Sequence, residues 1–303
     1  MDETSTVLVA VDFSPHARAA ALRACEIARA CAARVRLIHG AVVPAEVEGA
    51  GEASAKAAAQ QAAPLQELER WCSDLEALGA PISAVVEDAD PVELIARHAH
   101  AQDVLLLVMG MHGFRGFDRV FLGSVADRTL RTARVPILLV KENEQAAGLR
   151  IHRILLATDF SPASEHALRL AIQWARRLQA DVEVLHSIQE QDGEHDYPRP
   201  RDCASRSGHQ RANALESLRS ILSRTAAAGV RAVADLTYGP PSIEIVKHAA
   251  RSRADLVVLG LSGQPLSGGM RFGSVTERVL RHAKCSVLVA PDEWNGVLPG
   301  AAG

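Results

Sequence analysis

The strongest constraint on this chain is that it contains one sequence twice. The stretch that begins at Thr6 aligns with the stretch that begins at His152, and both contain the tetrapeptide Asp-Phe-Ser-Pro. A second pair of similar stretches begins at Gly110 and Gly260. Both offsets are about 150 residues, whereas solenoid repeats are roughly 20–50 residues long. The period therefore predicts two copies of a whole domain.

The length of the chain agrees with this organisation. At 303 residues it exceeds the size at which a single hydrophobic core usually stops growing. We expect one domain in residues 1–143 and a second in residues 151–293, joined through the polar stretch 141–150.

Each half alternates apolar runs with helical patterns. We expect strands near residues 7–11, 35–39, 82–86, 104–109, 137–140, 154–157, 182–186, 230–236, 256–259 and 287–290, and first-half helices near 15–32, 52–78, 91–101 and 125–132. The strand runs are nearly continuous in Val, Leu and Ile, which is typical of parallel strands buried on both faces. The pattern predicts two α/β domains, each a doubly wound, five-stranded parallel sheet. In such sheets ligands bind beyond the carboxyl ends of the strands, where the strand order reverses.

A glycine pattern follows the fourth strand of each half. It reads Gly110-x2-Gly113-x9-Gly123-Ser124 in the first half and Gly260-x2-Gly263-x9-Gly273-Ser274 in the second, and each Gly-Ser opens a helix. Close backbone approach, free N–H donors and a helix N-terminus together suit phosphate. We expect the two serines to cap their helices and to offer a hydroxyl to phosphate. The alternative is that the glycines only permit tight turns and the serines are ordinary caps.

An aspartate ends the first strand of each half, at Asp12 and Asp159. A carboxylate at this edge can accept hydrogen bonds from an adenine amino group or a ribose hydroxyl. The alternative is structural, because the Ser-Pro pair that follows resembles an N-cap with proline in the first turn, where an acidic residue favours the helix start.

Two common nucleotide-binding patterns are absent from the sequence. No lysine follows a glycine-rich loop into a helix, and no G-x-G-x-x-G follows the first strand. This argues against a motor-type NTPase and against a dehydrogenase. Arg115, Arg119 and Arg271 lie within the glycine loops and either neutralise phosphate or are simply solvated.

With both glycine patterns and both aspartates, the chain resembles a tandem universal stress protein of the ATP-binding type over nearly its whole length. The family pattern is G-x2-G-x9-G followed by Ser or Thr, after an early strand that ends in Asp. The resemblance implies a Rossmann-like fold (adenine nucleotide α-hydrolase-like) and an ATP, ADP or AMP ligand with Mg²⁺. It also implies an intramolecular pseudo-dimer, in which the two domains pair through their last strands, 135–140 and 285–290. A homodimer of two chains is left open.

The resemblance also implies a set of nucleotide-binding residues in each half. In the first half these are Ala10, Val11, Asp12, Gly40, Met109, Gly110, Gly113, Gly123, Ser124 and Val125. In the second half they are Ala157, Thr158, Asp159, Ser187, Leu259, Gly260, Gly263, Gly273, Ser274 and Val275. Gly40 and Ser187 depart from the valine often found beside the base. No catalytic residue and no protein metal ligand is expected.

The function expected is nucleotide binding with a regulatory role in the stress response, through a protein partner that the sequence does not identify. One alternative is a slow Mg²⁺-dependent ATPase that uses the loop arginines, with His112 as the only histidine placed to assist. Another is a scaffold without nucleotide, or one linked to a metal through His195, Cys203 and His209, whose spacing fits no standard zinc pattern.

Composition limits the partners and the compartment. The net charge of -3 with no broad basic surface argues against nucleic acid. The longest apolar run, residues 104–109, is far shorter than the roughly 20 residues of a membrane span. The acidic start is unlike a signal peptide, and five cysteines without a CxxC pair suit a reducing compartment. We therefore expect a cytoplasmic protein that does not enter membranes.

Overall fold

The computed structural model describes residues 5–41, 50–101, 103–111, 122–141, 151–189, 202–261 and 273–292, with side chains at 50–61 and 202–207 left aside. The chain divides into two compact units. Unit 1 is Met1–Arg150 with Glu293–Gly303, and unit 2 is Ile151–Asp292. Each unit is a complete layered α/β domain, as the internal repeat predicts.

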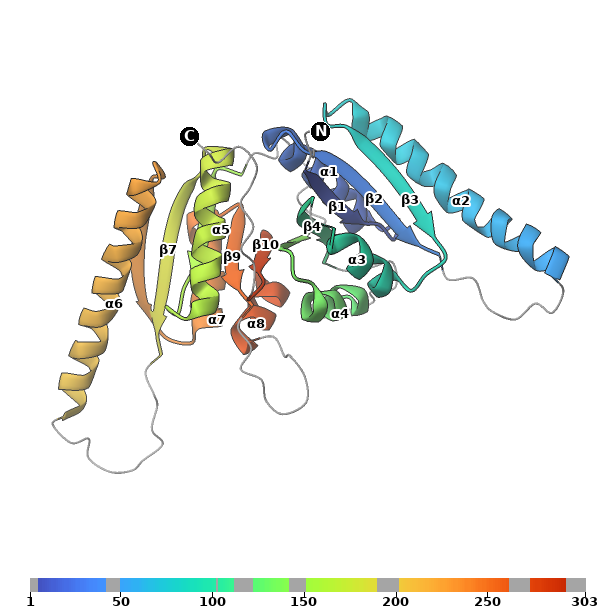
Figure 1. The fold of residues 1–303 in the computed structure, drawn as a ribbon. Coiled ribbons are helices and arrows are strands. Elements are labelled where there is room, and N and C mark those ends of the chain that lie inside the picture. The colour runs from blue at the N-terminus through green and yellow to red at the C-terminus, as the bar shows by residue number, and fades with distance from the viewer. Residues whose placement is uncertain are drawn as a thin grey trace. The chain divides into compact units, whose positions relative to one another are not determined.

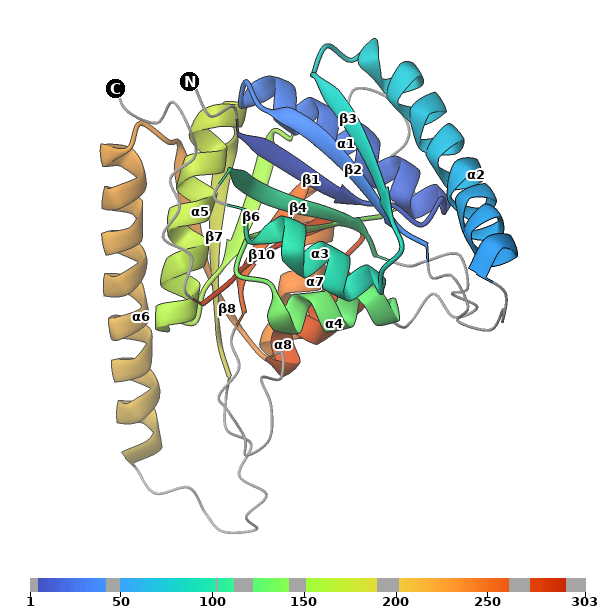
Figure 2. The same ribbon diagram turned by 45° about the vertical axis from the view of Figure 1, so that its right-hand side comes forward.

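Unit 1 is built on a parallel sheet in the order β3-β2-β1-β4-β5. Its strands are β1 (Thr6–Ala10), β2 (Arg34–Gly40), β3 (Ile82–Glu87), β4 (Val104–Gly110) and β5 (Ile137–Val140). Its helices are α1 (Pro15–Ala30), α2 (Ala50–Glu76), α3 (Pro91–Ala99) and α4 (Ser124–Thr132). Helices α1 and α2 cover one face, while α3 and α4 lie together on the other (Figures 1 and 2).

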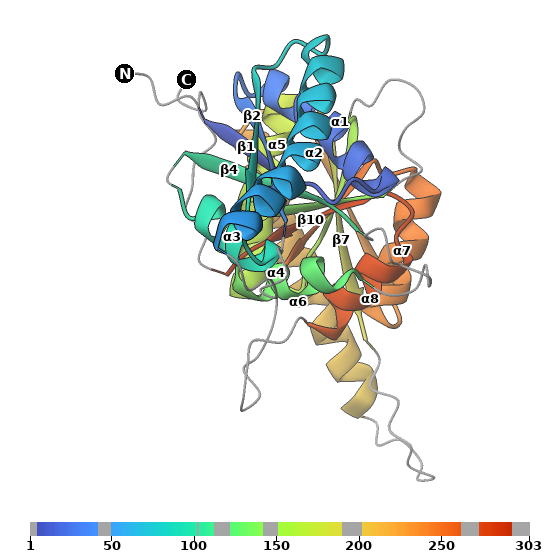
Figure 3. The ribbon, with the colours of Figure 1, turned by 90° about the vertical axis from the view of Figure 1, so that its right-hand side faces the viewer.

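Unit 2 repeats this plan with the strand order β8-β7-β6-β9-β10. Its strands are β6 (Arg153–Ala157), β7 (Asp181–Ile188), β8 (Ala232–Tyr238), β9 (Leu256–Gly260) and β10 (Ser286–Ala290). Its helices are α5 (Pro162–Leu178), α6 (Asp202–Ala227), α7 (Pro241–Ser252) and α8 (Ser274–His282). Helices α7 and α8 lie side by side, as Figure 3 shows. In both units the order reverses beside the first strand.

The apolar runs form the centre of each sheet. Val7, Leu8 and Val9 of β1 are fully buried, as are Leu106 and Leu107 of β4. Burial of consecutive residues means that both faces of the strand are covered, which removes apolar surface from water on each side. The prediction of a doubly wound parallel sheet is confirmed. Within the residues that the structure describes, no helix is long and apolar enough to cross a membrane.

The largest difference from the expected strand bounds is at β8. The strand was expected near 230–236 but begins at Ala232. The N–H of Val230 donates instead to the carbonyl of Thr225, at an N···O distance of 2.9 Å, and so closes the end of α6. Hydrophobic periodicity alone does not separate an apolar residue that ends a helix from one that starts a strand.

Of the four serines considered as N-caps in the sequence, two cap a helix and two do not. Ser14 and Ser161 cap α1 and α5, and their hydroxyls accept hydrogen bonds from backbone N–H groups three residues later. The prediction that Ser124 and Ser274 cap their helices is wrong. Gly123 and Gly273 are the N-caps, without a side-chain hydrogen bond, and each serine is the first helical residue.

Candidate functional site

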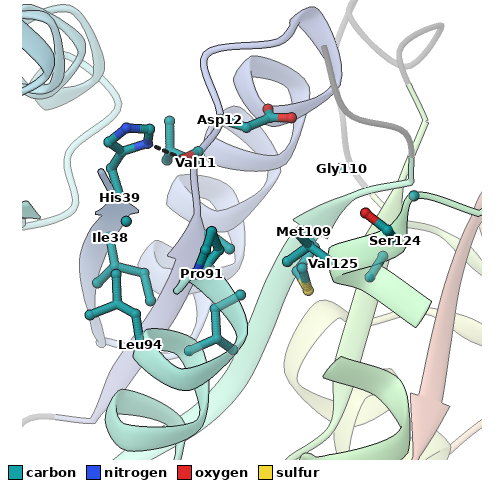
Figure 4. A pocket seen from close by; sticks show the side chains of 15 residues that line it. Val11, Asp12, Ile38, His39, Pro91, Leu94, Met109, Gly110, Ser124 and Val125 are labelled. Carbon is teal, nitrogen blue, oxygen red and sulfur yellow. Dashed lines mark hydrogen bonds between the residues drawn. The ribbon is translucent and has the colours of Figure 1, made fainter. Parts of the chain in front are cut away.

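In unit 1 the carboxyl ends of β1, β2 and β4 meet the N-termini of α3 and α4 around a cavity of about 280 Å³. It lies where the strand order reverses, the usual ligand position in open parallel sheets. The cavity is lined by Ala10, Val11, Asp12, Ile38, His39, Gly40, Pro91, Leu94, Ile95, Met109, Gly110, Gly123, Ser124, Val125 and Ala126. Figure 4 shows Ile38 and Leu94 on one side and Met109, Ser124 and Val125 on the other.

The cavity brings together every described residue that the sequence suggested for the first half. Gly113 lies outside the described residues, as do the loop arginines and His112. The apolar wall from α3, with Pro91, Leu94 and Ile95, did not emerge from the sequence. These residues belong to α3 and lie outside the glycine and aspartate patterns from which the site was predicted.

Unit 2 has a corresponding but smaller cavity of about 200 Å³. It is lined by Ala157, Thr158, Asp159, Ser161, Ser164, Leu185, Ser187, Pro241, Ile245, Leu259, Gly260, Val275 and Thr276. Gly273 and Ser274 are not among the lining residues, and Gly263 lies outside the described residues. The predicted set is therefore only partly assembled in the second unit.

The Asp-Phe-Ser-Pro element forms the same turn in both units. The N–H of Ser14 donates to Oδ1 of Asp12, and the N–H of Ser161 donates to Oδ1 of Asp159, each at 3.0 Å. Between them, Phe13 and Phe160 have φ values of 60° and 62°. A bulky residue in this left-handed region is uncommon and costs roughly 1–3 kcal/mol. Each aspartate thus stabilises a strained turn at the rim of the cavity.

The carboxyl group of Asp159 is a stronger acid than that of an ordinary aspartate. Partial desolvation would raise its pKa, but hydrogen bonds from the side chain and the backbone N–H of Ser161 act in the opposite direction, and the pKa lies below its usual value. A carboxylate stabilised in this way remains an acceptor at neutral pH. This is the state that an amino or hydroxyl group of a ligand would require.

Sequence reasoning missed a histidine that holds each turn. Nδ1 of His39 lies 2.7 Å from the carbonyl oxygen of Val11, and Nδ1 of His186 lies 2.8 Å from that of Thr158. An Nδ1–H donor suits both contacts. The rings also face the turn phenylalanines, with centroid distances of 4.7 Å and 4.3 Å. Both histidines occupy the same position of the repeat, which was the available signal.

The glycines of the motif have two different roles. A Cβ at Gly110 would lie 2.7 Å from Cβ of His16, and one at Gly260 would lie 2.5 Å from the carbonyl oxygen of Ala163. These two glycines therefore let the start of α1 or α5 approach the end of the central strand. The packing explains them without a ligand.

The backbone dihedral angles of the glycines that cap α4 and α8 do not require glycine. Gly123 has φ −58° and ψ 144°, and Gly273 has φ −57° and ψ 137°, which other residues adopt readily. Neither helix start receives a side-chain cap. The first N–H groups of a helix have no partner within it and carry the positive end of its dipole. In unit 1 these groups belong to residues at the cavity wall.

Metal and thiol chemistry have little support in the described residues. They contain no group of three or more His, Cys, Asp or Glu side chains placed to hold a metal ion. His209 is exposed on α6, whereas His195 and the Cys203 side chain lie outside what the structure describes. Burial raises the pKa of the Cys25 thiol to about 11, so this thiol is a poor nucleophile.

Comparison with known proteins decides the family. A model of the universal stress protein family matches residues 3–141 and, a second time, residues 150–291. The chain belongs to the universal stress protein family. Both units are thus universal stress protein domains, which confirms the resemblance to a tandem universal stress protein.

Individual universal stress proteins match parts or all of the chain. Universal stress protein MJ0531 of Methanocaldococcus jannaschii is 29% identical over 137 residues, which cover 45% of this chain and 80% of that protein. A universal stress protein of Mycolicibacterium smegmatis is 30% identical over 184 residues, 61% of this chain and 60% of the relative. The match thus spans about three fifths of that relative. A universal stress protein structure from Archaeoglobus fulgidus has a TM-score of 0.72 at 19% identity, covering 95% of this chain and 98% of that one, and shows the same fold.

Proposed function

We propose that this universal stress protein binds an adenine nucleotide at the carboxyl edge of its sheets and acts as a regulatory protein of the stress response. The observation that carries the proposal is the start of α4. Its first turn has no side-chain cap and forms part of the wall of the unit 1 cavity, together with Asp12. A helix N-terminus of this kind favours phosphate.

The remaining walls of the cavity suit the rest of a nucleotide. Ile38, Leu94 and Met109 provide an apolar surface on which a base can be buried. Asp12 lies at the rim, where its carboxylate can accept from an adenine amino group or a ribose hydroxyl. Ser124 adds a hydroxyl beside the helix start. The three chemical parts of a nucleotide thus each have a matching surface.

The dihedral angles of Gly123 and Gly273 support the same proposal. Their backbone conformation does not require glycine, and the missing Cβ would allow a phosphate group to come close to the helix start. Nucleotide-bound Mg²⁺ is usually held by phosphate oxygens with one or two carboxylates. The proposal therefore needs no dedicated metal cluster in the protein.

We propose binding and not turnover as the activity of this site. His39 contacts the carbonyl of Val11, and Asp12 accepts from the N–H of Ser14, so the two titratable groups among the described lining residues have structural roles. A nucleotide whose presence orders the surrounding loops would change the surface shown to a protein partner. Such coupling requires no chemical step.

Calorimetric titration with ATP, with and without Mg²⁺, tests the proposal. The double variant Gly123→Asp, Gly273→Asp places a carboxylate at both helix starts, where it should repel phosphate while still serving as an N-cap. Gly208→Asp is a charge-adding control, because Gly208 is exposed on α6 with nothing within 4 Å of a new Cβ. We expect saturable binding by the wild type and by the control, and its loss in the double variant. No saturable binding by the wild type would overturn the proposal.

A further inference from the structure

The two cavities differ at several positions of the repeat, and one of these lies in the first turn of α4 and α8. Ala126 is the third residue of α4 and Thr276 is the third residue of α8, and each is almost fully buried in its cavity wall. The hydroxyl of Thr276 donates to the carbonyl oxygen of Gly260 at 3.1 Å. Thr276 therefore fills space between the helix start and the end of the central strand, where alanine in unit 1 leaves a larger volume.

The other hydroxyl groups in the unit 2 wall are also committed within the protein. Thr158 donates to Oγ of Ser164 at 3.0 Å, and Ser164 donates to the carbonyl of Ser161 at 2.9 Å. Ser187 donates to the carbonyl of Gly239 at 2.8 Å. A ligand that needed a hydrogen bond from one of these hydroxyls would have to break an existing one, which costs part of the binding energy.

The position of the helix start relative to the cavity differs in the same direction. In unit 1 the wall includes four consecutive residues from the N-cap of α4 onwards, including Gly123 and Ser124. In unit 2 only Val275 and Thr276 of α8 take part. The unit 2 cavity is about 200 Å³, compared with about 280 Å³ in unit 1. It thus offers a ligand less volume and less of the helix N-terminus.

We propose that the two nucleotide sites are unequal, with the tighter site in unit 1 and a weaker site in unit 2 that Thr276 restricts. This inference rests on the proposed nucleotide binding. It assigns Ala126 and Thr276 as the pair that sets the difference in affinity. A difference of one or two heavy atoms in an apolar wall changes binding by about tenfold or more. At any subsaturating concentration the unit 1 site is therefore filled to a greater extent than the unit 2 site.

Each site can be measured by itself with ATP as the probe. Gly273→Asp leaves the unit 1 site, and Gly123→Asp leaves the unit 2 site. We expect the unit 1 dissociation constant to be about tenfold lower or more. Thr276→Ala in the Gly123→Asp background should tighten unit 2 binding by about the same factor, and Ala126→Thr in the Gly273→Asp background should weaken unit 1 binding. Thermal unfolding of every variant shows whether the domains remain folded.

The outcomes separate this inference from the proposal on which it rests. Equal affinities of the two isolated sites, or a tighter site in unit 2, would overturn the inequality while leaving nucleotide binding intact. Unchanged affinities in both folded exchange variants would overturn the role of the Ala126 and Thr276 pair. A wild-type protein that binds no ATP would overturn the proposed function and, with it, the inference.

Discussion

The turn after β1 and the turn after β6 have nearly the same backbone but different surroundings. Phe13 and Phe160 have φ values within a few degrees of each other, and a histidine holds the preceding carbonyl in both units. Trp71 of α2 packs edge-on against Phe13, with ring centroids 5.8 Å apart, and carries Arg18 over its face. In unit 2 Phe160 is exposed, and α6 has Ile221 at the matching position of the repeat.

This difference shows which part of a duplicated domain is held constant. The backbone of the turn depends on hydrogen bonds from the aspartate and the histidine, and both units keep them. The side chains around the turn affect packing and cavity shape, and these have changed. The turn geometry and its surroundings are therefore separable, and each of the following variants tests one of them.

We expect the largest effect where both units share a close contact. The methyl group of Gly260→Ala would lie 2.5 Å from the backbone oxygen of Ala163, so α5 would have to move. The free energy of unfolding should fall by about 1–3 kcal/mol, and by a similar amount in Gly110→Ala. Urea titration measures both. Gly208→Ala is the control on an exposed helix, where alanine should add about 0.5–1 kcal/mol. Wild-type stability of Gly260→Ala would refute the packing explanation.

A smaller and equal effect is expected from the two turn histidines. His39→Phe and His186→Phe keep an aromatic ring against the turn phenylalanine but remove the hydrogen bond to the carbonyl oxygen. Each should lower the free energy of unfolding by about 1–2 kcal/mol, because the carbonyl loses its partner. Scanning calorimetry of the two variants gives the comparison. Clearly unequal losses would show that the turns are not equivalent in energy.

Trp71→Ile gives α2 the residue that α6 has at the matching position, Ile221. It should affect unit 1 alone, because Trp71 contacts residues of that unit. It removes the contact with Phe13 and the stacking of Arg18. Beyond the loss of buried area, we expect a cost of about 0.5–1.5 kcal/mol. The reverse change, Ile221→Trp, should bring Phe160 a partner and reduce its exposure to collisional quenchers. An unchanged unfolding temperature for Trp71→Ile would mean that the aromatic contact contributes nothing.

We expect the smallest effect on stability from the change of pH around the pKa of Asp159. The pKa of Asp159 is lower in the folded protein than its ordinary value of about 3.9. Its stabilising contribution is therefore complete above that value and is lost as the pH falls through the folded-state pKa. The difference in unfolding temperature between wild type and Asp159→Asn should shrink below about pH 4. A difference that widened with acidification would contradict this sign.

Most of the fold could be predicted from the sequence, because the patterns that determine it lie within short segments of the chain. Runs of Val, Leu and Ile such as residues 104–109 can bury both faces only within a covered parallel sheet. Ser14 and Ser161 precede proline and can cap only the helix that follows. At Gly123-Ser124, by contrast, either residue is an acceptable cap, so the position of the helix start was not determined by residue type.

The parts of the site that escaped prediction depend on contacts between distant segments. His39 acts on Val11 from a neighbouring strand, and the need for glycine at Gly110 comes from His16 on α1. Neither contact has a sequence spacing that identifies it. The cavities likewise differ in volume although the glycine pattern is identical in both halves, because their walls include residues outside that pattern.

The alanine and threonine at the third position of α4 and α8 have a consequence for how the protein responds to changing ligand supply. An assembly of identical single-domain chains must carry the same residue in every copy, so all its sites fill over the same interval of concentration. A fused duplicate can mutate one copy alone. With affinities about tenfold apart, filling would extend over an interval roughly tenfold wider, and a partner that distinguished half-filled from filled protein would receive a graded signal.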